Sequence, residues 1–450
     1  MKTLVLSEVA KAVDGKITAD CNFTGVYTDS RKPVKGGLFI ALEGDRFDGH
    51  DFIKNAKEDG AAAVLCRKKC ETELPVIYVD DTKKALLDLA SYYRGFFDIP
   101  VVGLTGSVGK TTTKEMTALV VASEYNTIKT QGNLNNDIGM PMTLFNIEET
   151  TEAAVIEMGM NHKGEISALT AVSRPSLSII TNVGVSHIEN LGSRENILSA
   201  KLEILEGMKK GSALIINGDN DLLSTVENDG YDIVFFGIEN EKCHVKATDL
   251  EMTQDGTRCN ILFENNKYEC FVPVAGIHNV YDALSAFAAG VKLGISPEKA
   301  AAAIAQYVPA GMRQKVVEKN GIVFIEDCYN ASPDSVKAGI NTLHTIKSQR
   351  HIAVLGDMLE LGDYSETAHR ECGKYAAEKG TDVLFAYGKA SAFTADEAEK
   401  SSMNEVYHYT DEKLLAEKLS GFIKEGDAIL FKASRGMKLE NIINIIYSNM

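Results

Sequence analysis

One glycine-rich stretch carries the clearest chemical signal in the sequence. Residues 103–111 read GLTGSVGKT, which ends in the G-K-[ST] of the phosphate-loop pattern G-x-x-x-x-G-K-[ST] but has five residues instead of four between Gly103 and Gly109. The apolar run VVGL (101–104) leads into it and the helix-like stretch KTTTKEMTALVV follows. This context favours a nucleotide site over an ordinary glycine-rich turn, because backbone N–H groups and a helix N-terminus would surround the phosphates. The loop residues predicted to bind ATP are Gly106, Ser107, Gly109, Lys110, Thr111 and Thr112.

Two further polar residues stand where apolar runs end. Glu157 closes AAVIE, and His187 comes shortly after LSIITNVG. Ligands of open α/β sheets bind at the carboxyl ends of the strands, so both residues should lie beside the phosphate loop. Mg²⁺ prefers oxygen ligands, and imidazole joins them on occasion. Each residue alone could be a solvated carboxylate or a structural histidine, but their shared edge predicts an Mg²⁺ site formed with Thr111.

The elements around these residues alternate between short apolar runs and helix-like stretches. This alternation predicts a mostly parallel sheet that is covered on both faces. Residues 243–273 differ, because the turn-like sequences QDGT and ENNK are flanked by polar/apolar alternation that is typical of hairpins. The runs predicted to be strands are VVGL (101–104), AAVIEM (153–158), LSIITNV (177–183), ALIING (213–218) and DIVFFG (232–237).

The chain length and the distribution of these runs predict three α/β domains. A chain of 450 residues corresponds to about three domains of typical size. A small α/β unit precedes the phosphate loop, and a second strand–helix alternation begins after residue 311 with IVFIED, IAVLGD, DVLFAYG and AILFKAS. We therefore expect domains at 1–85, 86–310 and 311–450, the last of them Rossmann-like.

Composition narrows the class of protein. The formal net charge of -16, from 47 Lys+Arg and 63 Asp+Glu, disfavours non-specific binding to nucleic acid or anionic membrane. No apolar run approaches the roughly 18 residues that a membrane span needs, and the N-terminus lacks the pattern of a signal peptide. The 8 cysteines lack metal-site spacing, so we expect buried reduced thiols and a cytoplasmic protein.

Motifs spread over nearly the whole chain resemble those of the Mur ligase family. In order they are TDSRKPVKGGLFIALEGDRFDGHDFI (28–53), the phosphate loop, EMGMNHKGEI, TNVGVSHIENLGS, AKLEI, GIHNVYDALSA, GMRQ, EDCYNASPDS, LGDMLELG and KASRGMKLE. EMGMNH, YNASPDS and GDMLELG are most similar to family members that add D-alanyl-D-alanine to UDP-N-acetylmuramoyl-tripeptide in peptidoglycan synthesis. The resemblance implies a UDP-substrate domain, a central ATPase domain and a C-terminal ligase domain. It also implies an acyl-phosphate intermediate made from ATP.

The resemblance implies roles for the residues around the phosphates. Lys110 would stabilise the transferring phosphoryl group, and Thr111 and Glu157 would hold one Mg²⁺. His187 and Lys201 would serve a second Mg²⁺, with Lys201 carbamylated. Spacing alone would leave Lys201 as a solvated surface residue, whereas a carbamate turns the cation into an anion that can bind Mg²⁺. The catalytic residues implied in this way are Lys110, His187 and Lys201.

The resemblance also implies contacts with the nucleotide and the substrates. On the nucleotide it assigns Asn279 and Asp282 to the adenine side, Arg313 to phosphate and Asp327 to ribose. Asp282 departs from the asparagine of many relatives, which puts its adenine contact in question. For the substrates the implied residues are Ser30 and Arg31 at UDP, Asn135, and Tyr329, Asn330, Ser335 and Arg435 toward the dipeptide.

Two other classes of function stay open at this point. The first is another amide ligase of the same superfamily, which either adds diaminopimelate or is similar to folylpolyglutamate synthase. The Asn-Pro-Arg motif expected of a diaminopimelate-adding ligase is absent. A nucleotide-binding switch is the other, although the guanine-reading N-K-x-D motif is absent too. If the protein is a ligase of this superfamily, we expect small-molecule substrates, no nucleic-acid partner and a monomer.

Overall fold

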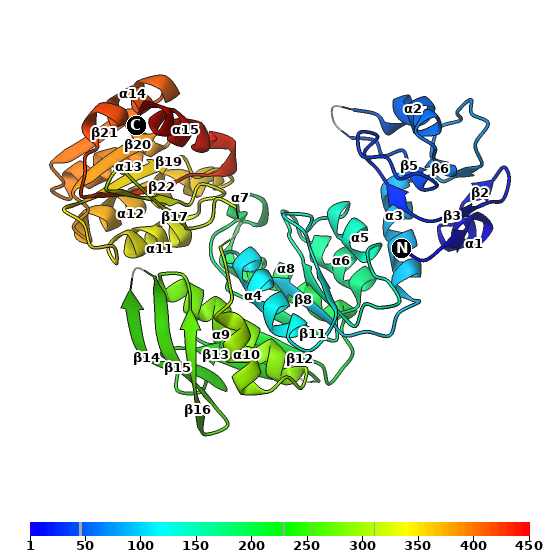
Figure 1. Ribbon diagram of the computed structural model, residues 1–450, viewed down its shortest axis with the longest axis horizontal. Coiled ribbons are helices and arrows are strands. Elements are labelled where there is room, and N and C mark those ends of the chain that lie inside the picture. Colours follow the sequence, from blue (N-terminus) through cyan, green and yellow to red (C-terminus); the bar gives the residue numbers. More distant parts are fainter. Residues whose placement is uncertain (45–46, 228–229, 254, 310) are drawn as a thin grey trace.

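The computed structural model describes the chain except residues 45–46, 228–229, 254 and 310. Three bodies are visible in Figure 1, with the N-terminal part (blue) and the C-terminal part (yellow to red) on either side above the central part (cyan to green). Each body is built on its own sheet. The α/β class and the three-domain arrangement expected from the sequence are therefore confirmed. Among the described residues, no helix is long and apolar enough to cross a membrane.

The N-terminal sheet has five strands and is mixed. Their order is β2 (Lys16–Ile17), β7 (Val76–Tyr78), β6 (Ala63–Cys66), β5 (Leu38–Ile40) and β4 (Val26–Tyr27), beside a small β1 (Leu4–Val5)–β3 (Asn22–Phe23) pair. The helices are α1 (Leu6–Ala12), α2 (Ile53–Glu58) and α3 (Thr82–Arg94).

Helix α3 joins the first two bodies. Asp81 caps it by accepting hydrogen bonds from the N–H groups of Lys83 and Lys84. It packs both on α1 and on the central helices α5 (Gly139–Leu144) and α6 (Glu165–Ser173). The boundary expected between residues 85 and 86 therefore falls inside a continuous helix, while the one expected at residue 310 lies outside the described residues.

The central sheet has nine strands. In spatial order they are β16 (Asn266–Val272), β15 (Gly256–Phe263), β14 (Val245–Thr253), β13 (Asp232–Gly237), β12 (Ala213–Asn217), β11 (Leu177–Ile180), β8 (Val101–Thr105), β10 (Ala153–Glu157) and β9 (Thr127–Lys129). All five predicted strands are present and parallel, and β14, β15 and β16 form the predicted antiparallel hairpins. Gln254 of the first predicted turn lies outside the described residues. Two features were not expected, namely β9 at the sheet edge and the parallel pairing of β14 with β13.

Alternate residues along the strands of the central sheet pack into two hydrophobic cores, one on each face. Val102, Leu104 and Val155 pack toward α4 (Lys110–Ala122), α9 (Ile277–Lys292) and α10 (Pro297–Ile304). Val101, Ala154 and Ile156 pack on the other face, toward α5, α6 and α8 (Arg194–Leu202). This two-sided burial explains why the strands are continuous apolar runs.

The C-terminal sheet has six strands, and all but β17 are parallel. Their order is β17 (Lys315–Lys319), β18 (Ile322–Glu326), β22 (Asp427–Lys432), β19 (Arg350–Gly356), β20 (Val383–Tyr387) and β21 (Glu405–Tyr409). One face is covered by α11 (Pro333–Leu343), α12 (Ser365–Glu378) and α13 (Ser391–Lys400). The other is covered by α14 (Glu412–Phe422) and α15 (Glu440–Asn449). The doubly covered sheet matches the predicted Rossmann-like layout.

Candidate active site

The phosphate loop joins the end of β8 to the start of α4. Gly109 precedes the helix with φ +84°, a conformation that glycine adopts without strain, and a Cβ there would lie 2.5 Å from Asp282 Oδ1. Asn182 Oδ1 accepts hydrogen bonds from the N–H groups of Ser107 (3.0 Å) and Val108 (2.8 Å), which fixes the shape of the loop. The N–H groups of the first turn of α4 have no intrahelical partner and can face an anion.

Lys110 lies inside this loop. Its Nζ donates hydrogen bonds to the carbonyl oxygens of Gly106 (2.8 Å) and Ser107 (3.4 Å). Burial lowers the pKa of Lys110, and Glu157 opposes that shift. The ammonium is thus held at the loop where the transferred phosphoryl group of a bound nucleotide would lie.

Thr111 and Glu157 meet as expected of an Mg²⁺ site. Thr111 Oγ1 donates to Glu157 Oε2 at 3.2 Å, and Asn135 Nδ2 donates to Glu157 Oε1 at 2.8 Å. Glu157 is almost fully buried at the end of β10, and its backbone N–H is held by Thr130 Oγ1. A hydroxyl and a carboxylate at this separation offer the oxygen ligands that Mg²⁺ prefers.

His187 and Lys201 are the two residues expected at a second metal position. His187 precedes α7 (Ile188–Leu191), and its Nδ1 lies 2.9 Å from Glu360 Oε2. Lys201 lies in α8 and is only 1% exposed. Burial, followed by repulsion from Lys110, holds the pKa of Lys201 well below its ordinary value, and no described carboxylate offsets this. The interpretation of Lys201 as a solvated surface residue, which spacing alone suggests, is therefore wrong.

The predicted adenine-side residues form a buried polar group with the start of the C-terminal domain. Asn279 Nδ2 donates to Ala275 O (2.8 Å) and to Gln314 Oε1 (2.7 Å), and Gln314 Nε2 lies 2.6 Å from His278 Nε2. Asp282 contacts α4, where it accepts a hydrogen bond from Thr113 Oγ1 at 2.7 Å. Asp282 therefore supports the phosphate loop from behind Gly109.

The C-terminal residues of the site lie around the first strands of that domain. The Arg313 guanidinium stacks over the Tyr329 ring, 4.0 Å from its centroid. Asp327 forms an ion pair with the buried Lys432 at 2.7 Å. Ser335 Oγ accepts the N–H of Ser332 at 2.8 Å as part of the cap of α11, so its hydroxyl has a structural role as well as the predicted ligand role.

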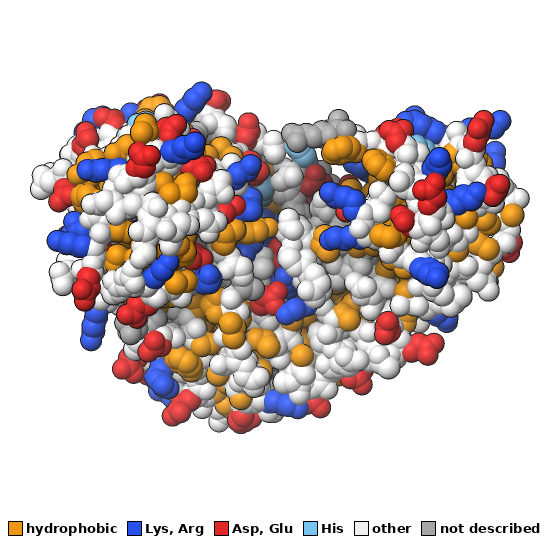
Figure 2. Space-filling view, turned by 45° about the horizontal axis from the view of Figure 1, so that its top comes forward, with side chains coloured by type: hydrophobic (Ala, Val, Ile, Leu, Met, Phe, Trp, Pro, Cys, Tyr) orange, Lys and Arg blue, Asp and Glu red, His pale blue; other side chains and the backbone are white. Residues whose placement is uncertain are grey.

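These residues line one cleft of about 460 Å³ between the central and C-terminal domains. Figure 2 shows the wider hollow between the C-terminal and N-terminal lobes, with lysine and arginine side chains along its walls. Of the predicted residues, the cleft is lined by Ser107, Gly109, Lys110, Thr111, Thr112, Asn135, Glu157, His187, Asn279, Asp282, Arg313, Asp327, Tyr329, Asn330 and Ser335.

Five predicted residues are not among those that line the cleft. Gly106 and Lys201 are buried, and Lys201 is near enough to Lys110 of the cleft to be repelled by it. Ser30 and Arg31 belong to the N-terminal domain, where Arg31 is exposed and bonds Asp29 through Nε at 2.9 Å. Arg435 pairs with Glu440 at 2.6 Å. The structure thus brings together most of the predicted nucleotide and metal residues, and leaves the predicted UDP residues on a separate body.

Sequence reasoning missed several residues that shape the site. Asn182 follows β11, so its position at a strand end was an available signal. Lys114 is fully buried one turn after Lys110, and its Nζ lies 3.0 Å from Glu115 Oε1 and 3.8 Å from Glu157 Oε2. The phosphate-loop motif stops short of this lysine, and its pairing could not be read from spacing.

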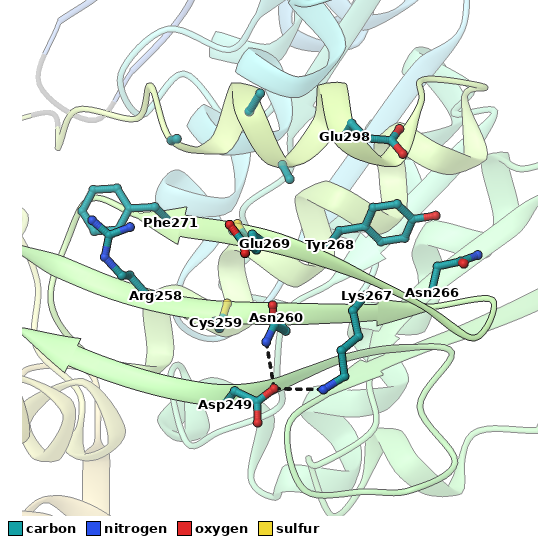
Figure 3. A pocket seen from close by; sticks show the side chains of 14 residues that line it. Asp249, Arg258, Cys259, Asn260, Asn266, Lys267, Tyr268, Glu269, Phe271 and Glu298 are labelled. Atoms are coloured by element: carbon teal, nitrogen blue, oxygen red, sulfur yellow. Dashed lines mark hydrogen bonds and ion pairs between the residues drawn. The ribbon is translucent and has the colours of Figure 1, made fainter.

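A second hollow, of about 980 Å³, lies between α10 and the edge strands β15 and β16. Three of its polar side chains bond one another, since Asp249 Oδ2 accepts from Asn260 Nδ2 (2.8 Å) and Lys267 Nζ (3.2 Å). The labelled side chains in Figure 3 lie along the strands, apart from Glu298 on α10, and do not converge on one point. This hollow therefore lacks the convergent groups that the interdomain cleft has.

Substitution of Asp282 is expected to change how stability depends on pH. Burial raises the pKa of Asp282 to about 7 from 3.8. Between these values the folded protein holds a proton that the unfolded chain has lost, so stability falls as pH rises, by up to about 1.4 kcal/mol per pH unit. Asp282→Asn keeps an acceptor for Thr113 but does not ionise. Thermal denaturation should show the variant melting with its parent at pH 4 and several degrees above it at pH 8, whereas an equal difference at both pH values would contradict the shift.

Comparisons with known proteins agree with this geometry. Three family models match, namely the Mur ligase family catalytic domain at residues 22–94, the Mur ligase middle domain at 104–290 and the Mur ligase glutamate ligase domain at 312–435. The UDP-N-acetylmuramoyl-tripeptide–D-alanyl-D-alanine ligase of Bacillus subtilis is 44% identical over 93% of this chain and 92% of its own.

Solved structures give the same result. A crystal structure of MurF from Acinetobacter baumannii has a TM-score of 0.92 and 29% identity, covering 99% of both chains. MurF ligase from Thermotoga maritima in complex with ADP has a TM-score of 0.85 and 27% identity, covering 94% of this chain and 97% of that one. With the phosphate loop, the strand-end carboxylate and the three sheets in the same chain, these matches lead to one conclusion: the protein belongs to the Mur ligase family.

Proposed function

We propose that this protein is an ATP-dependent ligase that joins D-alanyl-D-alanine to UDP-N-acetylmuramoyl-tripeptide in peptidoglycan precursor synthesis. The observation that carries the proposal is the 44% identity to a relative named for that reaction, over 93% of this chain. The cleft between the central and C-terminal domains supports it, because it combines a phosphate loop with polar residues of both domains. We place the reaction in the cytoplasm and in a monomer.

The chemistry we propose has two steps. The terminal carboxylate of the tripeptide attacks the γ-phosphorus of ATP, so that a new carboxyl O–P bond forms, the bond to the β-phosphate oxygen breaks and ADP leaves. The amine of D-alanyl-D-alanine then attacks the acyl carbon, loses a proton and expels phosphate from a tetrahedral intermediate. Positioning and charge neutralisation supply most of the catalysis in such transfers.

The chain's own residues have distinct parts in these steps. The loop amides and Lys110 would orient and neutralise the transferring phosphoryl group, because the lysine is already held at Gly106 and Ser107. Arg313 faces the same cleft across the domain boundary and would contact phosphate, while Asp327 would contact ribose. Tyr329 and Asn330 would meet the dipeptide, and Ser30 and Arg31 would bind the UDP end of the other substrate.

Two Mg²⁺ ions would supply charge neutralisation between the phosphates of ATP. Thr111 and Glu157 would hold the first, and their 3.2 Å separation suits a shared cation. His187 and Lys201 would hold the second, with Lys201 as a carbamate. A buried lysine with a depressed pKa has a neutral amine available to react with CO₂, which gives the carbamate anion and releases one proton.

A panel of acceptor and amine pairs tests the substrate assignment. Purified protein with ATP and Mg²⁺ would be given UDP-muramoyl-tripeptide with D-alanyl-D-alanine, UDP-muramoyl-dipeptide with diaminopimelate, or folate with glutamate. Mass spectrometry should find a new amide only with the first pair. Product with the second or third pair alone would replace the proposed substrates by those of another ligase of the superfamily. ATP hydrolysis equal with every pair and with none would point to a nucleotide-dependent switch.

A further inference from the structure

One histidine–carboxylate pair crosses the boundary between the central and C-terminal domains beside the cleft, which His187 lines. His187 lies before α7 of the central domain, and Glu360 lies in the loop that follows β19 of the C-terminal domain. Nδ1 of His187 and Oε2 of Glu360 are 2.9 Å apart, so this ring nitrogen faces the carboxylate at close range but outside hydrogen-bond alignment. The imidazole is 18% exposed and the carboxylate 59% exposed.

The contact lies within a packed docking surface. Val185 and Ile188 of the central domain pack against the apolar cluster of the C-terminal domain that contains Met358 and Leu361. Close approach continues at Gly362, where φ is +51° and a Cβ would lie 3.0 Å from Glu189 Cγ. The segments 185–189 and 358–362 therefore fix one another, and the ion pair is positioned by packing on both sides.

Both members of the pair have left-handed backbone conformations. His187 and Glu360 each have φ +64°. Such a conformation costs a residue other than glycine on the order of 1 kcal/mol or more, and it persists only where the surrounding structure determines it. Two such residues face one another across a domain boundary. This indicates that their side chains must be held in particular positions.

We propose that Glu360 is a positioning residue, which the C-terminal domain supplies to orient the His187 ring for the second Mg²⁺. A histidine that ligates a metal through one ring nitrogen commonly offers the other to a carboxylate, which fixes the ring. With Glu360 at Nδ1, the free nitrogen is Nε2, the atom available to a cation. Docking of the C-terminal domain would then complete the metal site. This inference rests on the metal role of His187 in the proposed function.

The test compares Glu360→Gln with a control at the same surface. Glu189→Gln removes one negative charge from α7 beside Gly362, and Glu189 has no described hydrogen bond or ion pair with His187. Mn²⁺ binding would be measured by electron paramagnetic resonance on the full chain with a non-hydrolysable ATP analogue, and the interdomain distance by fluorescence energy transfer. Circular dichroism would check that each variant is folded.

The expected result is a selective loss at one of two Mn²⁺ sites. Glu360→Gln should weaken that site about 10- to 100-fold, while the other site keeps its affinity, and Glu189→Gln should change neither. Unchanged Mn²⁺ binding in Glu360→Gln, with or without a changed interdomain distance, would overturn the positioning role and leave Glu360 as a docking contact only.

His187→Ala separates this failure from a failure of the underlying assignment. If His187→Ala weakens the second site and Glu360→Gln does not, the inference about Glu360 is wrong while the metal role of His187 stands. If His187→Ala also leaves both sites unchanged, the metal role and the inference fall together. Neither outcome touches the substrate assignment, which the acceptor and amine panel tests separately.

Discussion

Lys110→Ala is expected to reduce ligation on the order of 10³-fold or more while the protein stays folded. The ammonium is the only side-chain cation of the phosphate loop, and it would neutralise charge on the transferring phosphoryl group. Its hydrogen bonds go to the carbonyl oxygens of Gly106 and Ser107, which water can replace, so the fold does not depend on it. The measurement is the rate of amide formation with the proposed substrates, together with the melting temperature.

The control for this variant is Lys83→Ala. Lys83 is an exposed lysine in the first turn of α3, away from the cleft. It should keep the parent rate. Near-normal turnover in Lys110→Ala would remove the phosphate loop from the mechanism. A loss of both rate and melting temperature would mean that the lysine supports the fold.

Lys201→Ala is expected to be almost inactive and to recover part of its activity with a short-chain carboxylic acid. If the lysine acts as a carbamate, the variant loses the anion that holds the second Mg²⁺, which removes several kcal/mol of transition-state stabilisation. A loss of about 4 kcal/mol corresponds to roughly 10³-fold in rate. A small carboxylate that enters the space left by the side chain would restore the anion.

The readouts for Lys201 are the rate with increasing acetate and the intact mass of the native protein. The parent should show the added mass of CO₂ under gentle conditions, and Lys201→Ala should not. Lys209→Ala, an exposed lysine beyond α8, is the control and should behave as the parent in both measurements. Full activity of Lys201→Ala without added carboxylate would contradict the carbamate. So would a loss of activity that no carboxylate rescues, if the mass of the parent protein also lacks CO₂.

Much of the central sheet and half of the site could be predicted from patterns in short stretches of sequence. Continuous apolar runs mark strands that are buried on both faces, and polar residues at their carboxyl ends must share one edge. This is why Thr111 and Glu157 were expected together and meet at 3.2 Å. Strand β9 was missed because its three residues, Thr127–Lys129, are only half-buried at the edge and carry no apolar run.

Features that depend on contacts between distant segments could not be predicted from spacing. Lys201 reads as an ordinary helix lysine, because its burial comes from packing of α8 on the central sheet. Glu360 lies in a loop of another domain, and nothing in its own neighbourhood indicates His187. The expected boundary at residue 85 lies inside α3, whose buried face runs across it to reach α5 and α6, and such continuity is not readable from composition.

The most direct test of the central claim is phosphate release from ATP by the purified protein. It would be measured with UDP-N-acetylmuramoyl-tripeptide, with and without D-alanyl-D-alanine, and the product would be identified by mass. The proposed function predicts sustained release only when both substrates are present, with one UDP-pentapeptide formed for each phosphate. Release that is equal without the dipeptide, or release with both substrates but no pentapeptide, would contradict it.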